Sequence, residues 1–259
     1  MPAILDARGL CKRFGAVTAA NEVSAAIEKD SVVGLIGTNG AGKTTFINMI
    51  TGYIKPDRGA IEYEGHDITR LPPRAITRLG ISRSFQVPQL YGSLGVFDNM
   101  MVGLGIVLSN AGLGGFFSRG APLVPGYGKP AEEVAEHLLE RFGLLEYRNR
   151  NAQVLPGGAR KLLDIALTMV ARPRILLLDE PTSGVSAQEK FGIMQMVLEA
   201  VRAEGTTVLF VEHDMEVVSR FAQRVLAFYD GRIIADAPPQ VALADENVRR
   251  YVSGNRAQH

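Results

Sequence analysis

The sequence contains almost no cysteine. Among its 259 residues only Cys11 carries a thiol, which excludes an internal disulfide framework and a cysteine-rich metal site. Such low cysteine content is typical of proteins from a reducing compartment. We therefore expect the chain to work in the cytoplasm.

The sequence also lacks an excess of charge of either sign. Its 28 basic and 27 acidic residues nearly cancel, and no run of basic residues is present to follow a phosphate backbone. We therefore expect no nucleic-acid partner. The first residues, MPAILDARGL, place an acid where a signal peptide needs its apolar run, so we expect no export segment.

Charge is missing altogether from residues 99–118, a stretch almost long enough to span a membrane. Several glycines interrupt it, and in lipid they would leave backbone polar groups poorly satisfied. We predict a short buried helix that runs into a flexible glycine-rich loop. The alternative is an element that touches a membrane or a membrane-embedded partner.

Short apolar runs dominate the rest of the chain, of which 46% is hydrophobic. Alternating patterns at residues 23–27 and 59–63 predict an antiparallel sheet near the N-terminus. Continuous apolar runs, most of them followed by helix-length segments, predict buried parallel strands at residues 31–36, 175–178, 207–211 and 225–229. The pattern indicates an α/β fold with a mostly parallel core sheet.

A helical insertion interrupts this pattern. Strand-like runs disappear between residues 87 and 172, where residues 132–142 and 159–169 have the apolar spacing of helices. Residues 112–130 are rich in glycine and proline and predict a surface loop. After the insertion, Asp230 and Gly231 predict a hairpin turn, and short helical pieces follow up to Tyr251.

The sequence GTNGAGKT lies between a predicted strand and a predicted helix, the context that a phosphate-binding loop requires. Its glycines let backbone N–H groups converge on phosphates, Lys43 supplies a positive charge, and the Thr44 hydroxyl is suited to bind Mg²⁺. A glycine turn with an incidental lysine is the alternative. The candidate phosphate-binding residues are Gly37, Thr38, Asn39, Gly40, Ala41, Gly42, Lys43, Thr44 and Thr45.

Two acidic residues follow the apolar run ILLL. Asp179 and Glu180 are therefore predicted at the carboxyl end of a buried strand, where ligands of open α/β sheets bind. We expect Asp179 to face Mg²⁺ and Glu180 to orient or deprotonate the attacking water. The alternative is an acidic pair that only ends the strand.

His213 and Gln86 are two further candidates. His213 follows the run TVLFV, so it is predicted at the same sheet edge, where its ring could donate a hydrogen bond to the γ-phosphate; a purely structural histidine is the alternative. Gln86 follows the strand-like ISRSF and could touch Mg²⁺ or water, although its position alone does not establish that role.

A glycine pair in LPGGARK precedes the helix predicted at residues 159–169. Backbone N–H groups at a helix start form an anion site, so Gly157 and Gly158 are candidates to contact a phosphate. The sequence around them does not say which phosphate.

GTNGAGKTT, SFQ, LPGGA, LLLDEP and VEHD occur here in the order found in ATP-binding cassettes, and nearly the whole chain resembles an ATP-binding subunit of an ABC transporter. The resemblance implies a P-loop NTPase cassette that binds ATP and Mg²⁺. It implies that residues 37–45 are the Walker A loop, that Gln86 is the Q-loop glutamine and a Mg²⁺ ligand, and that residues 155–159 are the signature. Asp179 then binds Mg²⁺.

The same resemblance implies that Glu180 is the catalytic glutamate and His213 the switch histidine. Phe14 matches the aromatic residue that stacks on adenine, a contact of roughly 1–3 kcal/mol. For domains, it implies one cassette over residues 1–259. Residues 1–86 and 173–259 would form the core with an antiparallel β subdomain, and residues 87–172 a helical subdomain with an insertion near residues 105–130.

In this family two cassettes meet head to tail, and the signature of each covers the nucleotide of the other. The resemblance therefore implies a second cassette, identical or different, as a partner. Family members usually carry LSGGQ, whereas this chain has Pro156 and Ala159 at the second and fifth positions. Loss of the serine hydroxyl should weaken closure by roughly 1.5–3 kcal/mol. Ser186 replaces an aspartate that is common in the family.

GISRSFQ, the insertion after FDNMMVG and the signature proline resemble the larger ATPase subunit of branched-chain amino acid importers, a branch that also serves urea and amides. This resemblance implies permease subunits, an external solute-binding protein and a peripheral place on the cytoplasmic side of a bacterial membrane. One alternative is a lipopolysaccharide-export cassette, and another is a degenerate cassette that binds ATP beside an active paralogue. A P-loop kinase fits less well, because it would not need a glycine-rich signature before a helix. A DNA-repair or translation ATPase also fits less well, because it needs long coiled-coil arms or two cassettes in one chain, and this sequence shows neither.

Overall fold

The computed structural model describes residues 3–84, 90–112 and 122–252. They divide into two compact units. The first consists of Met1–Arg83, Arg174–Pro181 and Thr206–His259, and the second of Ser84–Pro173 and Thr182–Gly205. The functional subdomain boundaries expected from the sequence remain a prediction.

The first unit contains an antiparallel sheet with strand order β2-β1-β4-β5. Its long strands β1 and β2 alternate buried and exposed side chains, which places Leu5, Ala7 and Ile27 in the core. The predicted N-terminal antiparallel sheet is therefore confirmed. Its strands are β1 (Ala3–Phe14), β2 (Val17–Glu28), β4 (Arg58–Tyr63) and β5 (His66–Asp67).

A six-stranded sheet with the order β10-β9-β3-β8-β7-β6 forms the centre of the same unit. Strand β3 pairs in parallel with β8 and β9, and β7 pairs in parallel with β8, whereas β10 runs antiparallel to β9. All four predicted core strands and the predicted hairpin are therefore confirmed. The strands are β3 (Val32–Gly37), β6 (Ile81–Ser84), β7 (Ile175–Asp179), β8 (Thr207–Val211), β9 (Arg224–Tyr229) and β10 (Arg232–Ala237).

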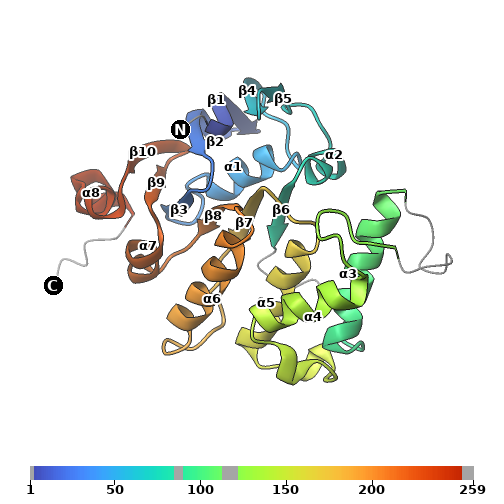
Figure 1. Ribbon diagram of the computed structural model, residues 1–259. Helices are drawn as coiled ribbons and strands as arrows, with labels where there is room; N and C mark the ends of the chain where they lie inside the picture. The colour runs from blue at the N-terminus through green and yellow to red at the C-terminus, as the bar shows by residue number, and fades with distance from the viewer. Residues whose placement is uncertain (1–2, 85–89, 113–121, 253–259) are drawn as a thin grey trace. The chain divides into compact units, whose positions relative to one another are not determined.

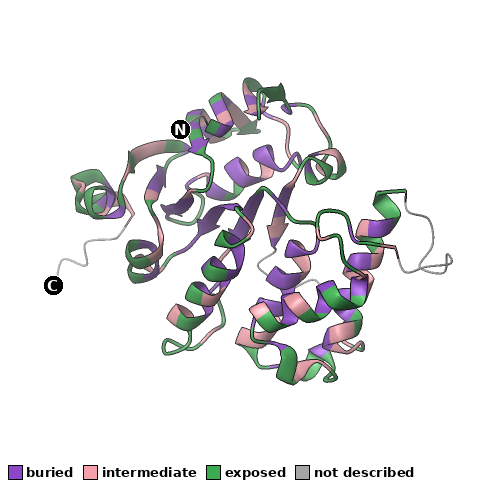
Figure 2. Cartoon of the chain, in the orientation of Figure 1, coloured by how far each residue is buried: buried purple, intermediate pink, exposed green. Residues whose placement is uncertain are grey.

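The central strands are buried on both faces. All six residues of β3 and all five of β8 are buried, which explains why these strands read as continuous apolar runs (Figure 2). Because β3, β7, β8 and β9 are linked by parallel pairings, their carboxyl ends share one edge of the sheet. The polar residues that follow β3, β7 and β8 therefore lie at that edge.

Helices of the first unit pack against these sheets. The ring of Phe46 on α1 lies 5.6 Å from the ring of Phe228 on β9, which fastens the helix after the glycine-rich loop to the core. The short helical pieces predicted near the C-terminus are present as α8 and α9. The helices are α1 (Lys43–Ile50), α2 (Pro73–Arg78), α7 (Met215–Phe221), α8 (Pro239–Ala244) and α9 (Glu246–Tyr251).

The second unit consists mainly of helices over its described residues (Figure 1). Two predicted helices are confirmed with small shifts at their ends, and both bury an apolar face, for example Leu138 on α4 and Leu163 on α5. The helices are α3 (Val96–Asn110), α4 (Ala131–Arg141), α5 (Gly157–Met169) and α6 (Lys190–Arg202), with 3₁₀ turns η1 (Leu145–Tyr147) and η2 (Ala152–Val154).

The charge-free stretch begins inside α3, which buries Met100, Leu104 and Leu108. The expected buried helix is thus present over residues 96–110, whereas residues 113–121 of the expected glycine-rich loop lie outside the described residues. Among the helices that the structure describes, none combines the length and apolarity needed to span a bilayer.

The described end of the insertion is fastened to the helical unit. Leu123 and Pro130 form an isolated antiparallel bridge, and the Tyr127 hydroxyl donates to the Met169 carbonyl at 2.9 Å. The Arg172 guanidinium lies 5.1 Å from the Tyr127 ring centre and forms a 2.7 Å ion pair with Glu204. Residues 122–130 are therefore an ordered part of the second unit.

Candidate functional site

The glycine-rich loop between β3 and α1 adopts backbone conformations that L side chains rarely adopt. Gly40 has φ +78° and Gly42 has φ +107°. A Cβ atom at Gly42 would lie 2.7 Å from the carbonyl oxygen of Ala19, whereas a Cβ atom at Gly40 would meet nothing within 4 Å. Gly42 is therefore needed for close packing, and the loop at Gly40 is open.

The hairpin between β9 and β10 fastens this loop to β2. The Gly231 N–H donates to the Ala41 carbonyl at 3.0 Å, and the Asn21 N–H donates to the Gly231 carbonyl at 2.8 Å. Asp230 and Gly231 both have positive φ, as expected for the tight turn that their sequence predicts. Sequence reasoning found the turn but missed its role as a support for the loop.

Lys43 begins α1 and points back into the loop. Its ammonium donates to the carbonyls of Gly37 at 2.6 Å and Thr38 at 3.0 Å, and only 6% of the residue is exposed. Burial lowers the pKa of this ammonium, and the carboxylates of Glu180 and Asp179 oppose that shift. The positive charge of Lys43 thus lies inside the glycine-rich loop, next to the backbone of Gly37 and Thr38.

The Thr44 side chain is on the exposed surface of α1, one residue after the lysine. Asp179 ends β7, and its Oδ2 atom accepts a hydrogen bond of 2.6 Å from Nη2 of Arg83. Sequence reasoning did not single out Arg83, because a lone arginine in the run ISRS carries no signal of its own.

Glu180 and His213 lie together at the carboxyl ends of β7 and β8. The Nε2 atom of His213 is 3.2 Å from the Oε1 atom of Glu180. Glu180 has φ +48°, and its N–H donates to the Val211 carbonyl at 3.1 Å. A left-handed conformation costs a non-glycine residue about 1–2 kcal/mol, and such strain is common at functional sites.

The two neighbours of His213 have structural roles. Asp214 caps α7, and its side chain accepts hydrogen bonds from the N–H groups of Glu216 at 2.9 Å and Val217 at 3.3 Å. Glu212 is buried, and its N–H donates to the Leu35 carbonyl. The histidine is thus held between a buried residue and a helix cap.

Phe14 ends β1 and is 48% exposed. The Lys12 ammonium lies 5.6 Å from the ring centre and forms a 2.7 Å ion pair with Asp57. The ring is therefore exposed to solvent, with the Lys12 ammonium near it.

Gly157 and Gly158 are the first residues of α5 in the second unit, directly after Pro156. A Cβ atom at Gly158 would lie 2.7 Å from Cδ1 of Ile193, and one at Gly157 would lie 3.2 Å from the Gly184 carbonyl oxygen. Pro156 has φ −54° and ψ 153°, a normal conformation for the residue before a helix.

Arg160 holds the segment that leads into this helix. Its guanidinium donates to the carbonyls of Gln153 at 3.0 Å and Leu155 at 3.2 Å. In the same unit, the Ser186 hydroxyl donates to the Glu189 carboxylate at 2.6 Å. Arg160 and Glu189 were not singled out from the sequence.

The candidates divide between the two units. Lys43, Asp179, Glu180 and His213 are brought together in the first unit, whereas Gly157 and Gly158 belong to the second. Gln86 lies outside the described residues.

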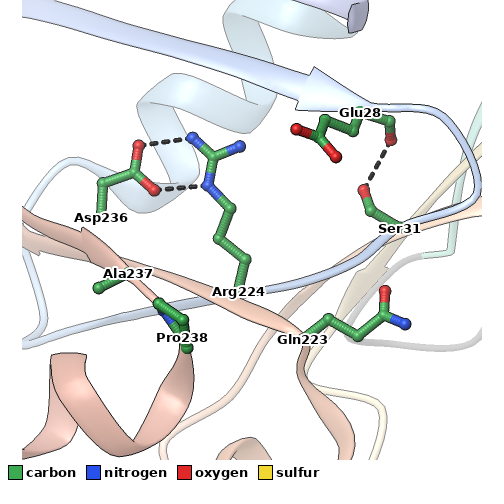
Figure 3. A pocket seen from close by; sticks show the side chains of 7 residues that line it. All are labelled: Glu28, Ser31, Gln223, Arg224, Asp236, Ala237 and Pro238. Carbon is green, nitrogen blue, oxygen red and sulfur yellow. Dashed lines mark hydrogen bonds and ion pairs between the residues drawn. The ribbon is translucent and has the colours of Figure 1, made fainter. Parts of the chain in front are cut away.

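A separate pocket of about 420 Å³ lies at the opposite edge of the central sheet, where β3 and β9 begin (Figure 3). Its Arg224 guanidinium forms two hydrogen bonds to Asp236, at 2.5 Å and 2.6 Å, and a third to the Ala26 carbonyl. Because the pocket lies where these strands begin, whereas the glycine-rich loop follows the end of β3, the pocket is not part of the phosphate site.

A phosphate loop after a buried parallel strand, an acidic pair at the end of a second strand and a histidine after a third define a nucleoside triphosphatase of the P-loop class. The comparisons with known proteins identify the family within this class.

The family model described as "ABC transporter" matches residues 20–183. The chain is 36% identical over 237 residues to the high-affinity branched-chain amino acid transport ATP-binding protein BraF of Pseudomonas aeruginosa, with 92% of each chain covered. It is 35% identical to LivG of Escherichia coli K12, a protein with the same description, over 96% of this chain and 97% of the relative.

Solved structures agree with these matches. The ADP conformation of MJ1267, an ATP-binding cassette of an ABC transporter, superposes with a TM-score of 0.80 at 30% identity and covers 96% of this chain and 97% of that chain. A nucleotide-free ATP-binding cassette from an ABC transporter gives the same TM-score and identity, with 95% and 97% covered. The chain belongs to the ABC transporter family. It is the ATP-binding, ATP-hydrolysing component of such a transporter.

Proposed function

We propose that this chain energises the uptake of branched-chain amino acids or a related polar nutrient. The observation that carries the proposal is the match to BraF and LivG at 35–36% identity over more than nine tenths of every chain compared. A match of this extent includes the helical unit as well as the nucleotide-binding core.

For nucleotide binding, we assign the triphosphate to residues 37–45 and the adenine to Phe14. The open backbone at Gly40 and the buried Lys43 ammonium suit an anion, and the exposed Phe14 ring suits stacking. These residues therefore fit a nucleoside triphosphate.

For the metal, the described residues contain no group of three or more His, Cys, Asp or Glu side chains able to hold a cation by themselves. A hydroxyl and a carboxylate, from Thr44 and Asp179, suit a hard cation that keeps waters and binds phosphate oxygens, as Mg²⁺ does. Bound Mg²⁺ would neutralise charge on the phosphates. Gln86 remains a further candidate ligand.

For hydrolysis, we assign Glu180 to the attacking water. A carboxylate accepts a proton from the water or orients it. The Nε2 atom of His213 lies 3.2 Å from this carboxylate, and we assign the His213 ring a hydrogen bond to the γ-phosphate when nucleotide is bound. The strained backbone of Glu180 supports this assignment, because such strain persists where geometry serves function.

For assembly, we propose that two cassettes pair head to tail, with Gly157 and Gly158 of one facing the γ-phosphate held by the other. A side chain at Gly158 would collide with Ile193 and one at Gly157 would crowd Gly184, so both positions favour glycine, which has no side chain to cover the N–H groups of this helix start. Permease subunits in the membrane, with an external solute-binding protein, would complete the transporter. The chain would then be peripheral on the cytoplasmic side.

The test is solute-stimulated ATP hydrolysis by the intact transporter. The complex is purified through an affinity tag on this chain, reconstituted in liposomes and supplied with its solute-binding protein and leucine, isoleucine, valine, urea or a short amide. We expect at least one of these solutes to raise hydrolysis severalfold above the solute-free rate. Stimulation by none of them, with another solute class active, would contradict the proposed substrate. A tagged chain that copurifies without any multi-span protein would contradict the transporter role itself.

A further inference from the structure

Arg83 connects two elements of the nucleotide site. Its Nη2 atom donates to Oδ2 of Asp179 at 2.6 Å, and its Nη1 atom donates to Oδ1 of Asn48 at 2.6 Å. The side chains of Arg83 and Asp179 are only 10% and 16% exposed. A partly buried arginine that bonds two different elements with both terminal nitrogens is held in one geometry.

The second partner is informative because of its place on α1. Asn48 is four residues after Thr44, so both side chains lie on the same face of this helix, one turn apart. Arg83 therefore links the helix face that carries Thr44 to the strand end that carries Asp179.

We infer that Arg83 is a positioning residue that sets the spacing between Thr44 and Asp179 for the nucleotide-bound metal. This inference rests on the proposed function, which makes these two residues the metal ligands. Arg83 touches neither ATP nor the metal in this account, and it acts through Asn48 and Asp179.

An arginine suits this task better than a lysine. The guanidinium is planar and presents its donors in a fixed fork, so one side chain can hold an amide oxygen and a carboxylate at a defined separation. A lysine ammonium is a point charge on a flexible stem and fixes no such separation. A positive charge at position 83 is therefore not enough to set this separation, and we expect Arg83→Lys to behave like a variant that has lost both hydrogen bonds.

The experiment measures binding of a fluorescent ATP analogue to the purified chain with Mg²⁺ and with EDTA. The metal enhancement is the dissociation constant in EDTA divided by that in Mg²⁺. The variants are Arg83→Met, Arg83→Lys and Asn48→Ala. Arg224→Met is the matched control, because Arg224 is also paired with an aspartate in the first unit but at the far edge of the sheet (Figure 3).

We expect the metal enhancement to fall about tenfold in both Arg83 variants and about threefold in Asn48→Ala. Affinity in EDTA should stay within twofold of the unmodified chain, because the Lys43 loop is intact. Arg224→Met should change neither value. A merely structural role for Arg83 would lower affinity equally with and without the metal.

An unchanged enhancement in folded Arg83 variants would overturn the inference. Tighter metal-dependent binding would also overturn it, because Arg83 would then compete with the cation for Asp179. If the Arg83 variants do not fold, the Asn48→Ala variant tests the inference, because it removes only the hydrogen bond between Arg83 and Asn48. A failure of the unmodified chain to bind the analogue at all would instead contradict the proposed function.

Discussion

The imidazole Nε2 atom of His213 lies 3.2 Å from the Oε1 atom of Glu180, although 33 residues separate them in the chain. The contact arises because β7 and β8 pair in parallel, with Asp179 opposite Val211, so the residues after each strand meet. The carboxylate that we assign to the attacking water is thereby held by a side chain from a neighbouring strand.

Replacement of Glu180 by glutamine keeps the shape of the side chain and removes its ability to accept a proton. We expect the hydrolysis rate of Glu180→Gln to fall at least a hundredfold, while the affinity for ATP stays within a few-fold. Steady-state hydrolysis and equilibrium binding measure the two effects separately.

The matched control is Glu216→Gln, which changes an acid in the first turn of α7 that has no assigned role in hydrolysis. Its rate should equal that of the unmodified chain. Normal turnover by Glu180→Gln would remove Glu180 from the mechanism. An unmodified chain that is inactive even with its partner cassette would instead favour a degenerate cassette.

Two glycines of the phosphate loop provide a test of its packing. Both have positive φ, but only at Gly42 would a Cβ atom collide with backbone, at 2.7 Å from the Ala19 oxygen. We expect Gly40→Ala to lower the free energy of unfolding by about 1 kcal/mol through backbone strain alone. Gly42→Ala should cost about 2–4 kcal/mol, because the clash adds to the strain. Urea unfolding measures both, and equal losses would refute the packing argument.

Tyr63 gives a prediction for alkaline pH. Its buried hydroxyl has no hydrogen-bond partner among the described residues, and burial raises its pKa to about 12. Between pH 10 and pH 12 the unfolded chain releases this proton while the native state keeps it, so stability falls as pH rises. Tyr63→Phe removes this loss.

We therefore expect Tyr63→Phe to match the unmodified chain in stability at pH 8 and to exceed it at pH 11. Replacing an unpartnered hydroxyl by hydrogen costs little at neutral pH. Urea unfolding at both pH values is the measurement. An identical alkaline loss in both proteins would show that Tyr63 titrates normally.

Pro156 offers a gain of function. Its φ and ψ suit a serine before a helix, so Pro156→Ser should fold normally and place a hydroxyl at the start of α5. A new hydrogen bond to a phosphate is worth roughly 1.5–3 kcal/mol, or about ten- to a hundredfold in affinity. We expect ATP-dependent pairing of cassettes to tighten by this factor in the Glu180→Gln background, as measured by analytical ultracentrifugation.

Pro156→Ala is the control for that prediction, because it removes the proline ring without adding a hydroxyl. If both substitutions tighten pairing equally, the hydroxyl is not responsible. If neither changes it, the start of α5 does not face the nucleotide of the neighbour.

Much of the fold could be predicted from the sequence because its strands are buried on both faces. The run VVGLIG of β3 has no polar side chain, and in β8 only the first residue, Thr207, is polar. The start of the antiparallel sheet gave a weaker pattern. Strand β1 has register shifts near Leu10, and these break the alternation of apolar and polar residues that identifies a half-buried strand.

Part of the candidate site could also be predicted from the sequence, and part could not. Lys43, Asp179 and His213 follow predicted strands, so the topology alone places them at one sheet edge. Arg83 and the loop support from Gly231 were missed, because each depends on pairing between segments far apart in the chain. A single arginine or a turn glycine has no local pattern that reveals its partner.

The most direct test of the account is a structure of the transporter with Glu180→Gln in this chain and Mg²⁺·ATP bound. In that structure we expect a triphosphate against Lys43 on one side and against the signature glycines of the neighbouring cassette on the other. We also expect Gly157 and Gly158 of this chain to contact the nucleotide that the neighbouring cassette holds. A closed pair of cassettes in which residues 37–45 contact no phosphate, or in which both glycines face away from every nucleotide, would contradict it.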